Sequence, residues 1–194
     1  MTTRKHTNSV SQLSLRVRRS STRTWYARWC IEAHGAQPYG KRPYQYHLRR
    51  VADVAIRFGL SSREVDMLCW AHDVLEDTDR TRQAMLAVGF PIRVVDAVEA
   101  LSDEEGVDRH DKKAKTLPKI KANRLSLIGK LCDRIANVEE GKKSGNKKFF
   151  MYKEEHHFFK EVLFDESDTE LLPLWQHLEN LFETGITFKG AQAA

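Results

Sequence analysis

The segment LCWAHDVLEDT spans residues 68–78 and places an imidazole and three carboxylates directly after an apolar run. On a helix, Glu76 lies one turn after His72, and residues one turn apart share a face. Asp77 stands in the same relation to Asp73. Three neighbouring carboxylates repel one another, so this face requires either a bound cation or contact with water. The solvated end of an amphipathic helix is therefore the simpler alternative to a cation site.

The sequence on both sides of this segment predicts short helices. Apolar residues recur at helical spacing over 43–59, with Pro43 in the first turn, and Ser61 with Glu64 forms a capping box for a helix through residue 71. Residues 103–116 are polar and charged, which predicts a surface loop or a frayed helix. Further helices are expected over about 27–33, 91–102, 125–138, 149–164 and 171–182, with a turn at 141–145. Because few windows alternate with period two, the fold class is all-α, with about eight helices.

A second polar cluster interrupts an apolar helix in the segment KLCDRIANVE, residues 130–139. Asp133 and Asn137 are four residues apart and share a face, and Lys130 and Arg134 flank them. An aspartate in an apolar stripe is costly unless it is paired or binds a metal. An ion pair of Asp133 with a neighbouring basic residue at the helix surface stays open beside the metal interpretation.

A third candidate, His47, follows an aromatic stretch on the predicted helix over 43–59. Alone, it is equally a hydrogen-bonded core residue. Together with His72, Asp73 and Asp133 it makes two imidazoles and two carboxylates, a set that suits Mn²⁺, Fe²⁺ or Zn²⁺ better than Mg²⁺ or Ca²⁺. Such an ion would acidify a bound water and polarise a phosphoryl group.

These segments resemble the HD superfamily of metal-dependent phosphohydrolases, whose ligands follow the order H…HD…D. The similarity is greatest to the hydrolase domain of the RelA/SpoT family and to the stand-alone small alarmone hydrolases. It rests on HDVLEDT at 72–78, AHGAQPYGKRPYQYH at 33–47 and KLCDRIANVE at 130–139, and it covers about residues 26–140. The resemblance implies an HD-domain helical bundle that removes the 3′-pyrophosphate of guanosine tetra- or pentaphosphate.

The same resemblance implies roles for individual residues. It implies that His47, His72, Asp73 and Asp133 bind one divalent metal ion. Mn²⁺ is the first expectation, and Fe²⁺, Zn²⁺ and Co²⁺ are the alternatives. It implies that Glu76 and Asp77 orient or deprotonate the attacking water. Its candidates for contact with substrate, or for supporting structure, are Lys130, Arg134 and Asn137.

Other basic residues are candidates for the phosphate on electrostatic grounds, because a pyrophosphate must be neutralised before another anion attacks it. The first group is Arg109, Lys112, Lys113 and Lys115, for which a solvated loop is an equal alternative. Lys147, Lys148 and Tyr152 are further candidates, whereas His156 and His157 are interpreted as surface or packing residues.

The chain departs from the family between Gln37 and His47, where the basic pair that normally lies against the guanine base is out of register. Tyr39, Lys41 or Arg42 are the candidates to replace it. The departure leaves the base preference open. It also keeps two alternatives in play, an HD nucleotidase or a phosphodiesterase for another nucleotide.

The positive charge of this 194-residue chain is concentrated at its N-terminus. Residues 1–24 hold six of the 32 basic residues and no acidic one, so the remaining 26 basic residues face 27 acidic ones. We expect a flexible basic extension over 1–24, one HD hydrolase domain over 25–185 and a tail over 186–194. The extension is compatible with binding nucleic acid or an acidic partner, with organelle import, or with a solvated lead-in.

The amino-acid composition indicates the class of protein and the cellular compartment. At 41% hydrophobic and 30% charged residues, without a long apolar run, the chain is expected to be soluble and not membrane-bound. Three cysteines without a C-x-x-C pair indicate buried thiols in a reducing, cytoplasmic compartment. A regulatory, antitoxin-like binding protein that acts through the basic extension is the alternative outside enzymes.

Overall fold

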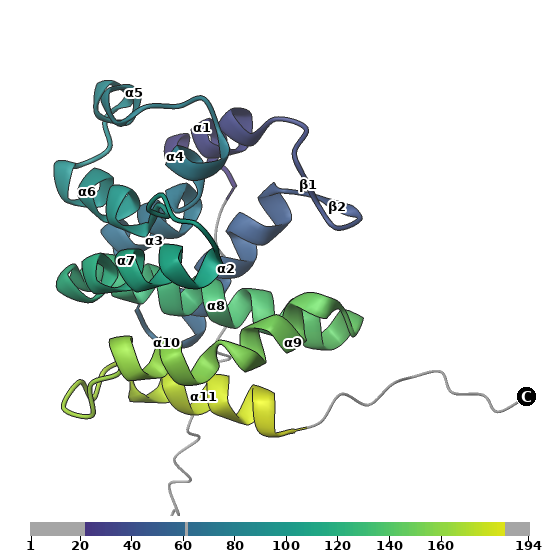
Figure 1. The fold of residues 1–194 in the computed structure, drawn as a ribbon. Coiled ribbons are helices and arrows are strands. Elements are labelled where there is room, and N and C mark those ends of the chain that lie inside the picture. Colours follow the sequence, from purple (N-terminus) through teal and green to yellow (C-terminus); the bar gives the residue numbers. More distant parts are fainter. Residues whose placement is uncertain (1–21, 61, 185–194) are drawn as a thin grey trace, which may run out of the picture.

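The computed structural model describes residues 22–60 and 62–184, which form a helical bundle with one small hairpin (Figure 1). The elements are α1 (Trp25–His34), β1 (Pro38–Tyr39), β2 (Arg42–Pro43), α2 (Gln45–Arg57), α3 (Arg63–Ala71), α4 (Val74–Asp77), α5 (Arg82–Val88), α6 (Ile92–Leu101), α7 (Arg109–Ala122), α8 (Arg124–Ser144), α9 (Lys147–Glu154), α10 (His156–Leu163) and α11 (Leu172–Glu183). The expected basic extension and C-terminal tail fall almost wholly outside the described residues. The predicted domain limits therefore stay predictions.

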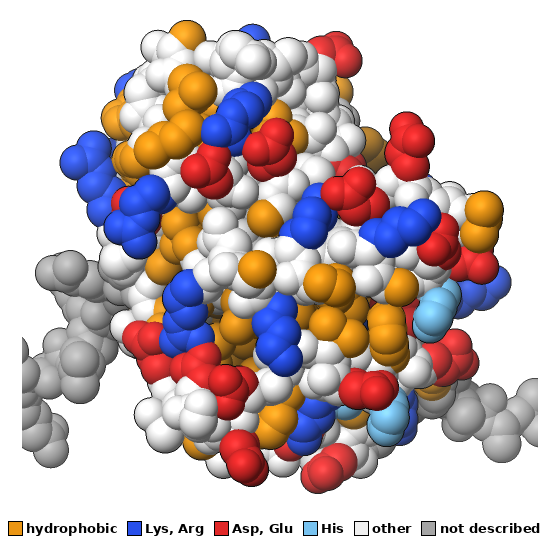
Figure 2. Space-filling view, turned by 60° about the vertical axis from the view of Figure 1, so that its left-hand side comes forward, with side chains coloured by type: hydrophobic (Ala, Val, Ile, Leu, Met, Phe, Trp, Pro, Cys, Tyr) orange, Lys and Arg blue, Asp and Glu red, His pale blue; other side chains and the backbone are white. Residues whose placement is uncertain are grey.

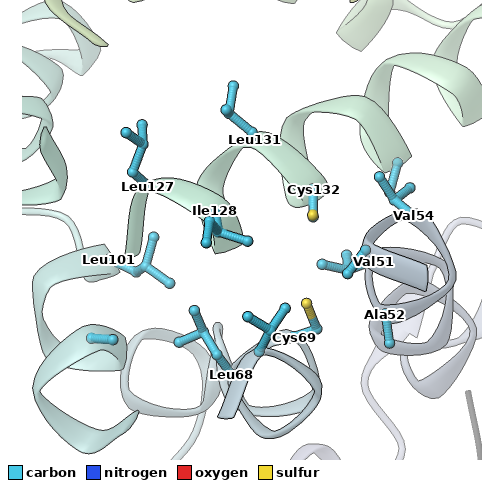
Figure 3. Close-up of a cluster of buried hydrophobic side chains, with 14 of the residues drawn as sticks. Val51, Ala52, Val54, Leu68, Cys69, Leu101, Leu127, Ile128, Leu131 and Cys132 are labelled. Carbon is cyan, nitrogen blue, oxygen red and sulfur yellow. The ribbon is translucent and has the colours of Figure 1, made fainter. Parts of the chain in front are cut away.

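The centre of the bundle is the packing of α2, α3 and α8 (Figure 3). Side chains from the three helices point toward one another, with the thiols of Cys69 and Cys132 near the middle. These two cysteines and Cys30 are free and buried, as the sequence predicted. The largest fully buried side chain is that of Trp70. Since α3 ends at the HD dipeptide and α8 carries Asp133, this core fixes the distance between the two motifs.

Gly129 lets α8 approach α3 closely. A Cβ atom at this position would lie 2.7 Å from Cδ2 of Leu68 and 3.2 Å from its Cγ. Leu68 is fully buried, so its side chain has no free space into which it could move. The glycine is thus required by packing, although it lowers the intrinsic helix propensity of α8.

The described part of the chain holds eleven helical segments where about eight were expected. Part of the difference is a break at Glu155, which divides the single helix expected over 149–164 into α9 and α10. Another part is α7, because residues 109–116 are helical and only 103–108 form a loop. Its signal is Asp108, whose side chain accepts from the backbone N–H of Asp111 at 2.8 Å and caps the helix.

Three local expectations were wrong. Ser62, not Ser61, caps α3, accepting from the N–H of Val65 at 3.2 Å. Pro43 lies in β2, and α2 begins two residues later. The predicted turn at 141–145 is still helical up to Ser144, and α8 closes at Gly145 in the left-handed conformation that glycine tolerates best.

The surface toward α5 and α6 carries both signs of charge (Figure 2). Arg82, for example, pairs with Asp96 at 2.5 Å and with Glu99 at 2.7 Å. Among the described residues, no helix combines the length and apolar character that crossing a bilayer requires.

Substituting Gly129→Val should lower the free energy of unfolding by about 2 kcal/mol, because the new methyl groups overpack the contact with Leu68. The control Ala114→Val lies on an exposed face of α7 and should cost only about 0.5 kcal/mol of helix propensity. Urea denaturation measures both. Equal losses in the two variants would show that the close approach of α3 and α8 is not constrained here.

Candidate metal and phosphate site

The HD dipeptide lies at a sharp turn between two helices. His72 follows the last residue of α3 and caps it, and Asp73 precedes α4 with φ −102° and ψ 0°. Within one continuous helix, adjacent residues point in different directions. The break at 72–73 allows both side chains to reach the same point. These residues were expected on one unbroken helix, so the break was not predicted from the sequence.

Four polar atoms converge there from α2, the turn and α8. Nε2 of His47 lies 3.2 Å from Nε2 of His72. Oδ1 of Asp133 lies 3.2 Å from the first nitrogen and 3.6 Å from the second. Oδ2 of Asp73 lies 2.8 Å from His72 Nε2 and 3.5 Å from His47 Nε2. Apart from the adjacent His72 and Asp73, residues 25 to 86 positions apart in the sequence thus meet at one point, where the two imidazoles are almost fully buried.

This donor set fits a divalent metal ion. Bonds of ~2.1 Å at right angles place neighbouring donor atoms about 3.0 Å apart, close to the separations observed. The Nδ1 atom of His72 donates to the carbonyl oxygen of Cys69 at 2.9 Å, which leaves Nε2 free as a ligand. His47, His72 and Asp133 form a compact group whose ligand atoms all lie within 4.8 Å of one another. Asp73 contacts the same nitrogens but lies outside that group.

The electrostatics show how strongly the site favours positive charge. Burial opposes protonation of His72, yet the carboxylates of Asp73 and Asp133 outweigh burial and raise its pKa well above the ordinary value. Burial likewise disfavours the charge on Asp73, but the two imidazoles lower its pKa well below the ordinary value. The two carboxylates thus favour a positive charge between them, which a divalent cation would supply.

A layer of hydrogen bonds orients the acidic side chains. Asn137 donates to Oδ1 of Asp133 at 2.5 Å and accepts from the hydroxyl of Tyr39 at 2.8 Å, so it acts here as a support of the metal cluster. The hydroxyl of Tyr44 lies 2.6 Å from Oδ2 of Asp73 and 2.9 Å from Oδ2 of Asp77.

Gln37 extends this layer. It donates to Oδ2 of Asp77 at 2.9 Å, and its Oε1 lies 2.7 Å from Nδ1 of His34. Sequence reasoning assigned no role to Tyr44, Gln37 or His34, although all three belong to the quoted 33–47 segment. His34 and its partner Gln37 both lie in that segment. The aspartates that Tyr44 and Gln37 contact lie 29 to 40 residues further along the chain, so the segment alone did not reveal them.

The cluster borders a cavity of about 960 Å³, which His47, Asp73 and Asp133 line and His72 does not. Most of the predicted site residues line it: Tyr39, Lys41, Arg42, His47, Asp73, Glu76, Asp77, Arg109, Lys130, Asp133, Arg134 and Asn137. Lys147, Lys148 and Tyr152 line it too, whereas His156 and His157 do not.

Lys112 does not line the cavity. It was predicted together with Arg109, but residues 109–122 form a helix, on which Arg109 and Lys113 share a face. Lys113 is the residue that faces the cavity. Lys115 is also outside, and its ammonium pairs with Asp111 at 2.8 Å.

Arg134 is a structural residue as much as a wall of the cavity. It is only 3% exposed, and its guanidinium lies 4.4 Å from the ring centroid of Tyr152 and 4.2 Å from that of Phe159. It pairs at 3.2 Å with Glu155, which also binds Arg109. Glu155 escaped sequence analysis because both its partners are distant in the chain.

The sequence matches no known family model and no curated protein. Among solved structures, the chain is similar to that of a metazoan ortholog of SpoT, described as hydrolysing ppGpp and playing a role in starvation responses. The two share a TM-score of 0.65 over 82% of this chain and 95% of the other, at 17% sequence identity. This likeness shows the fold. The all-α bundle expected from the sequence is confirmed, and its fold is that of the SpoT ortholog.

We predict that the wild-type protein binds one Mn²⁺ per chain, measured by equilibrium dialysis with elemental analysis. At an ion concentration of 100 times Kd, binding should raise the melting temperature by about 5 °C or more. His47→Gln and Asp133→Asn should lose both effects. The control His177→Gln changes a histidine outside the cavity that contacts Glu139 at 2.8 Å, and it should keep them. Retained stoichiometric binding in both ligand variants would contradict the assignment.

Proposed function

We propose that this chain is a metal-dependent phosphohydrolase that releases the 3′-pyrophosphate of guanosine tetra- or pentaphosphate. The observation that carries the proposal is the convergence of His47, His72, Asp73 and Asp133 beside a cavity that lysine and arginine side chains also line. Support comes from the fold shared with the SpoT ortholog, whose description names ppGpp hydrolysis. The three ordered motifs point the same way.

The four converging residues would hold the metal, with Mn²⁺ proposed first and Fe²⁺, Zn²⁺ or Co²⁺ as alternatives. A divalent ion bound there would supply Lewis-acid polarisation of the phosphoryl group and acidification of a water molecule. Asn137 and Tyr44 would keep the two aspartates oriented for binding. Three cysteines that are all free agree with the cytoplasmic setting proposed for the protein.

Glu76 is the better candidate for accepting the proton of the attacking water. Its carboxylate lines the cavity, and no hydrogen bond to it occurs in the described part of the chain. Desolvation and the neighbouring Asp103 and Asp73 raise its pKa, and a raised pKa makes a stronger base. Asp77, by contrast, is engaged by Tyr44 and Gln37, so its role would be to hold the wall of the site.

Cations beside the metal cluster would neutralise the substrate. Lys130 lies 3.8 Å from Oδ2 of Asp133, and Lys113 pairs with Asp103 at 2.6 Å. Burial and the charge of Lys130 lower the pKa of Lys113, so a bound phosphate would relieve the repulsion between the two ammonium groups. Arg109, held by Glu155, would add a third positive charge.

The decisive test of function is incubation of the purified chain with ppGpp and Mn²⁺, followed by ion-exchange chromatography. GDP and pyrophosphate should form with the metal and should not form after chelation. Asp73→Asn should remove turnover while the far-ultraviolet circular dichroism stays unchanged. A panel of other nucleotides belongs in the same experiment. Hydrolysis of one of these, without any of ppGpp, would favour the nucleotidase or phosphodiesterase alternative.

Glu76→Gln should lower kcat by about 10²-fold or more, because the amide cannot accept a proton. In the wild type, kcat should rise with pH as Glu76 loses its proton. The raised pKa places this rise at higher pH than for an ordinary glutamate. Glu76→Asp, which keeps a carboxylate, should keep the rise, and Glu76→Gln should lose it. An unchanged pH profile in Glu76→Gln would exclude Glu76 as the base.

A further inference from the structure

The basic residues that line the cavity fall into two sets. One set is paired with carboxylates: Arg109 and Arg134 with Glu155, Lys113 with Asp103, and Lys130 with Asp133. The other set has no carboxylate oxygen within 4.0 Å in residues 22–60 and 62–184: Lys41, Arg42, Lys147 and Lys148. An anionic ligand gains most from cations that no carboxylate already neutralises.

The unpaired set comes from two elements at the same end of the cavity. Lys41 and Arg42 lie on the β1–β2 hairpin, which turns at Gly40 with φ +61°. Lys147 and Lys148 begin α9. Figure 1 shows the hairpin and α9 on the same side of the bundle, and Nζ of Lys148 lies 5.9 Å from the ring centroid of Tyr39. The guanidinium of Arg42 lies over the ring of Tyr46 at 4.1 Å, a closer ring contact than that of Lys148. Among the basic residues of this set in the described part of the chain, Lys41, Lys147 and Lys148 are therefore the better candidates for an anion.

The position of α9 is fixed by packing against α8. A Cβ atom on Gly141 would lie 3.2 Å from both Cβ and N of Phe149, so a larger residue would push α9 away from α8 by a few tenths of an ångström. Phe149 is 3% exposed and anchors the helix. The side chain of Asn146 accepts from the backbone N–H of Lys148 at 2.9 Å and caps the first turn. The two lysines are therefore held at the cavity by a buried anchor.

Tyr39 separates this end of the cavity from the metal cluster. Its ring stacks on that of His47, with the centroids 4.7 Å apart and the planes at 12°. Nζ of Lys148 lies near the same ring. The ring of Tyr39 is thus occupied by His47 and Lys148, and we do not assign it to stacking against the nucleotide base. The cavity thus has a metal cluster at one end and unpaired lysines at the other, with one aromatic ring between them.

We propose that Lys41, Lys147 and Lys148 form a second phosphate subsite, which binds the 5′-phosphate group of the nucleotide while its 3′-pyrophosphate lies at the metal cluster. This assignment rests on the proposed function, because it takes the substrate to carry phosphates on both sides of the ribose. It makes the three lysines specificity-determining residues. They select nucleotides by phosphorylation at the 5′ position, independently of the base.

The test compares ppGpp with guanosine 3′-diphosphate, which lacks the 5′-phosphates. In Lys147→Ala/Lys148→Ala, KM for ppGpp should rise at least tenfold, while kcat and the KM for guanosine 3′-diphosphate stay within twofold of wild type. The control Lys121→Ala/Lys143→Ala removes the same charge from exposed positions outside the cavity and should behave as wild type. An unchanged KM for ppGpp in the first variant overturns the subsite.

A binding measurement separates this proposal from the proposed function. GDP carries the 5′-diphosphate and no 3′-phosphate, and its Kd is measured by calorimetry with the full chain in the presence of a chelator. Lys147→Ala/Lys148→Ala should weaken GDP binding at least tenfold relative to the control. If neither substrate is hydrolysed by the wild type, the proposed function fails. The GDP result then decides the subsite alone, and equal affinities overturn it.

Discussion

Two imidazole nitrogens 3.2 Å apart, each facing two aspartate oxygens, are the constraint on which the rest of this structure depends. Such a cluster is stable in a protein interior only when positive charge sits between the carboxylates. Its members come from α2, from the turn after α3, and from α8, so the three elements must be held in a fixed relation. The buried side chains between these helices, and the glycine at position 129, supply that relation. The packing of the hydrophobic core thus determines the geometry of the site.

The convergence of the four side chains could be expected from the sequence because two of its signals are local and the third, His47, joined them through the order of the motifs. His72 and Asp73 are adjacent, and Asp133 lies in an apolar helix where an unpaired carboxylate would be costly. The ion pairs Lys113–Asp103 and Arg109–Glu155, by contrast, could not be predicted from the sequence. They join side chains from separate elements, and any of the many charged residues of this chain would have been an equal partner on the sequence alone. Lys112 was predicted at the cavity for the same reason, since a run of lysines does not reveal which one faces inward.

The helices likewise divide into those that the sequence predicts and those that it does not. Apolar periodicity located α2, α6 and α11 within a few residues, because burial of one face determines them. It left a loop and a frayed helix as alternatives over residues 109–116, because polar residues dominate there and, of the α7 residues, only Thr116, Leu117 and Ile120 are fully buried. It also missed the break at Glu155. There the carboxylate binds two arginines from α7 and α8, and this tertiary interaction outweighs the local preference for one continuous helix.

The central claim is that the four converging side chains bind one divalent cation. Anomalous diffraction from crystals grown with Mn²⁺ tests it most directly, because the signal locates the ion and its ligands together. The account predicts one strong peak within bonding distance of Nε2 of both histidines and of a carboxylate oxygen from both Asp73 and Asp133. A site that stays empty at saturating Mn²⁺, or an ion bound only by surface carboxylates, would contradict it.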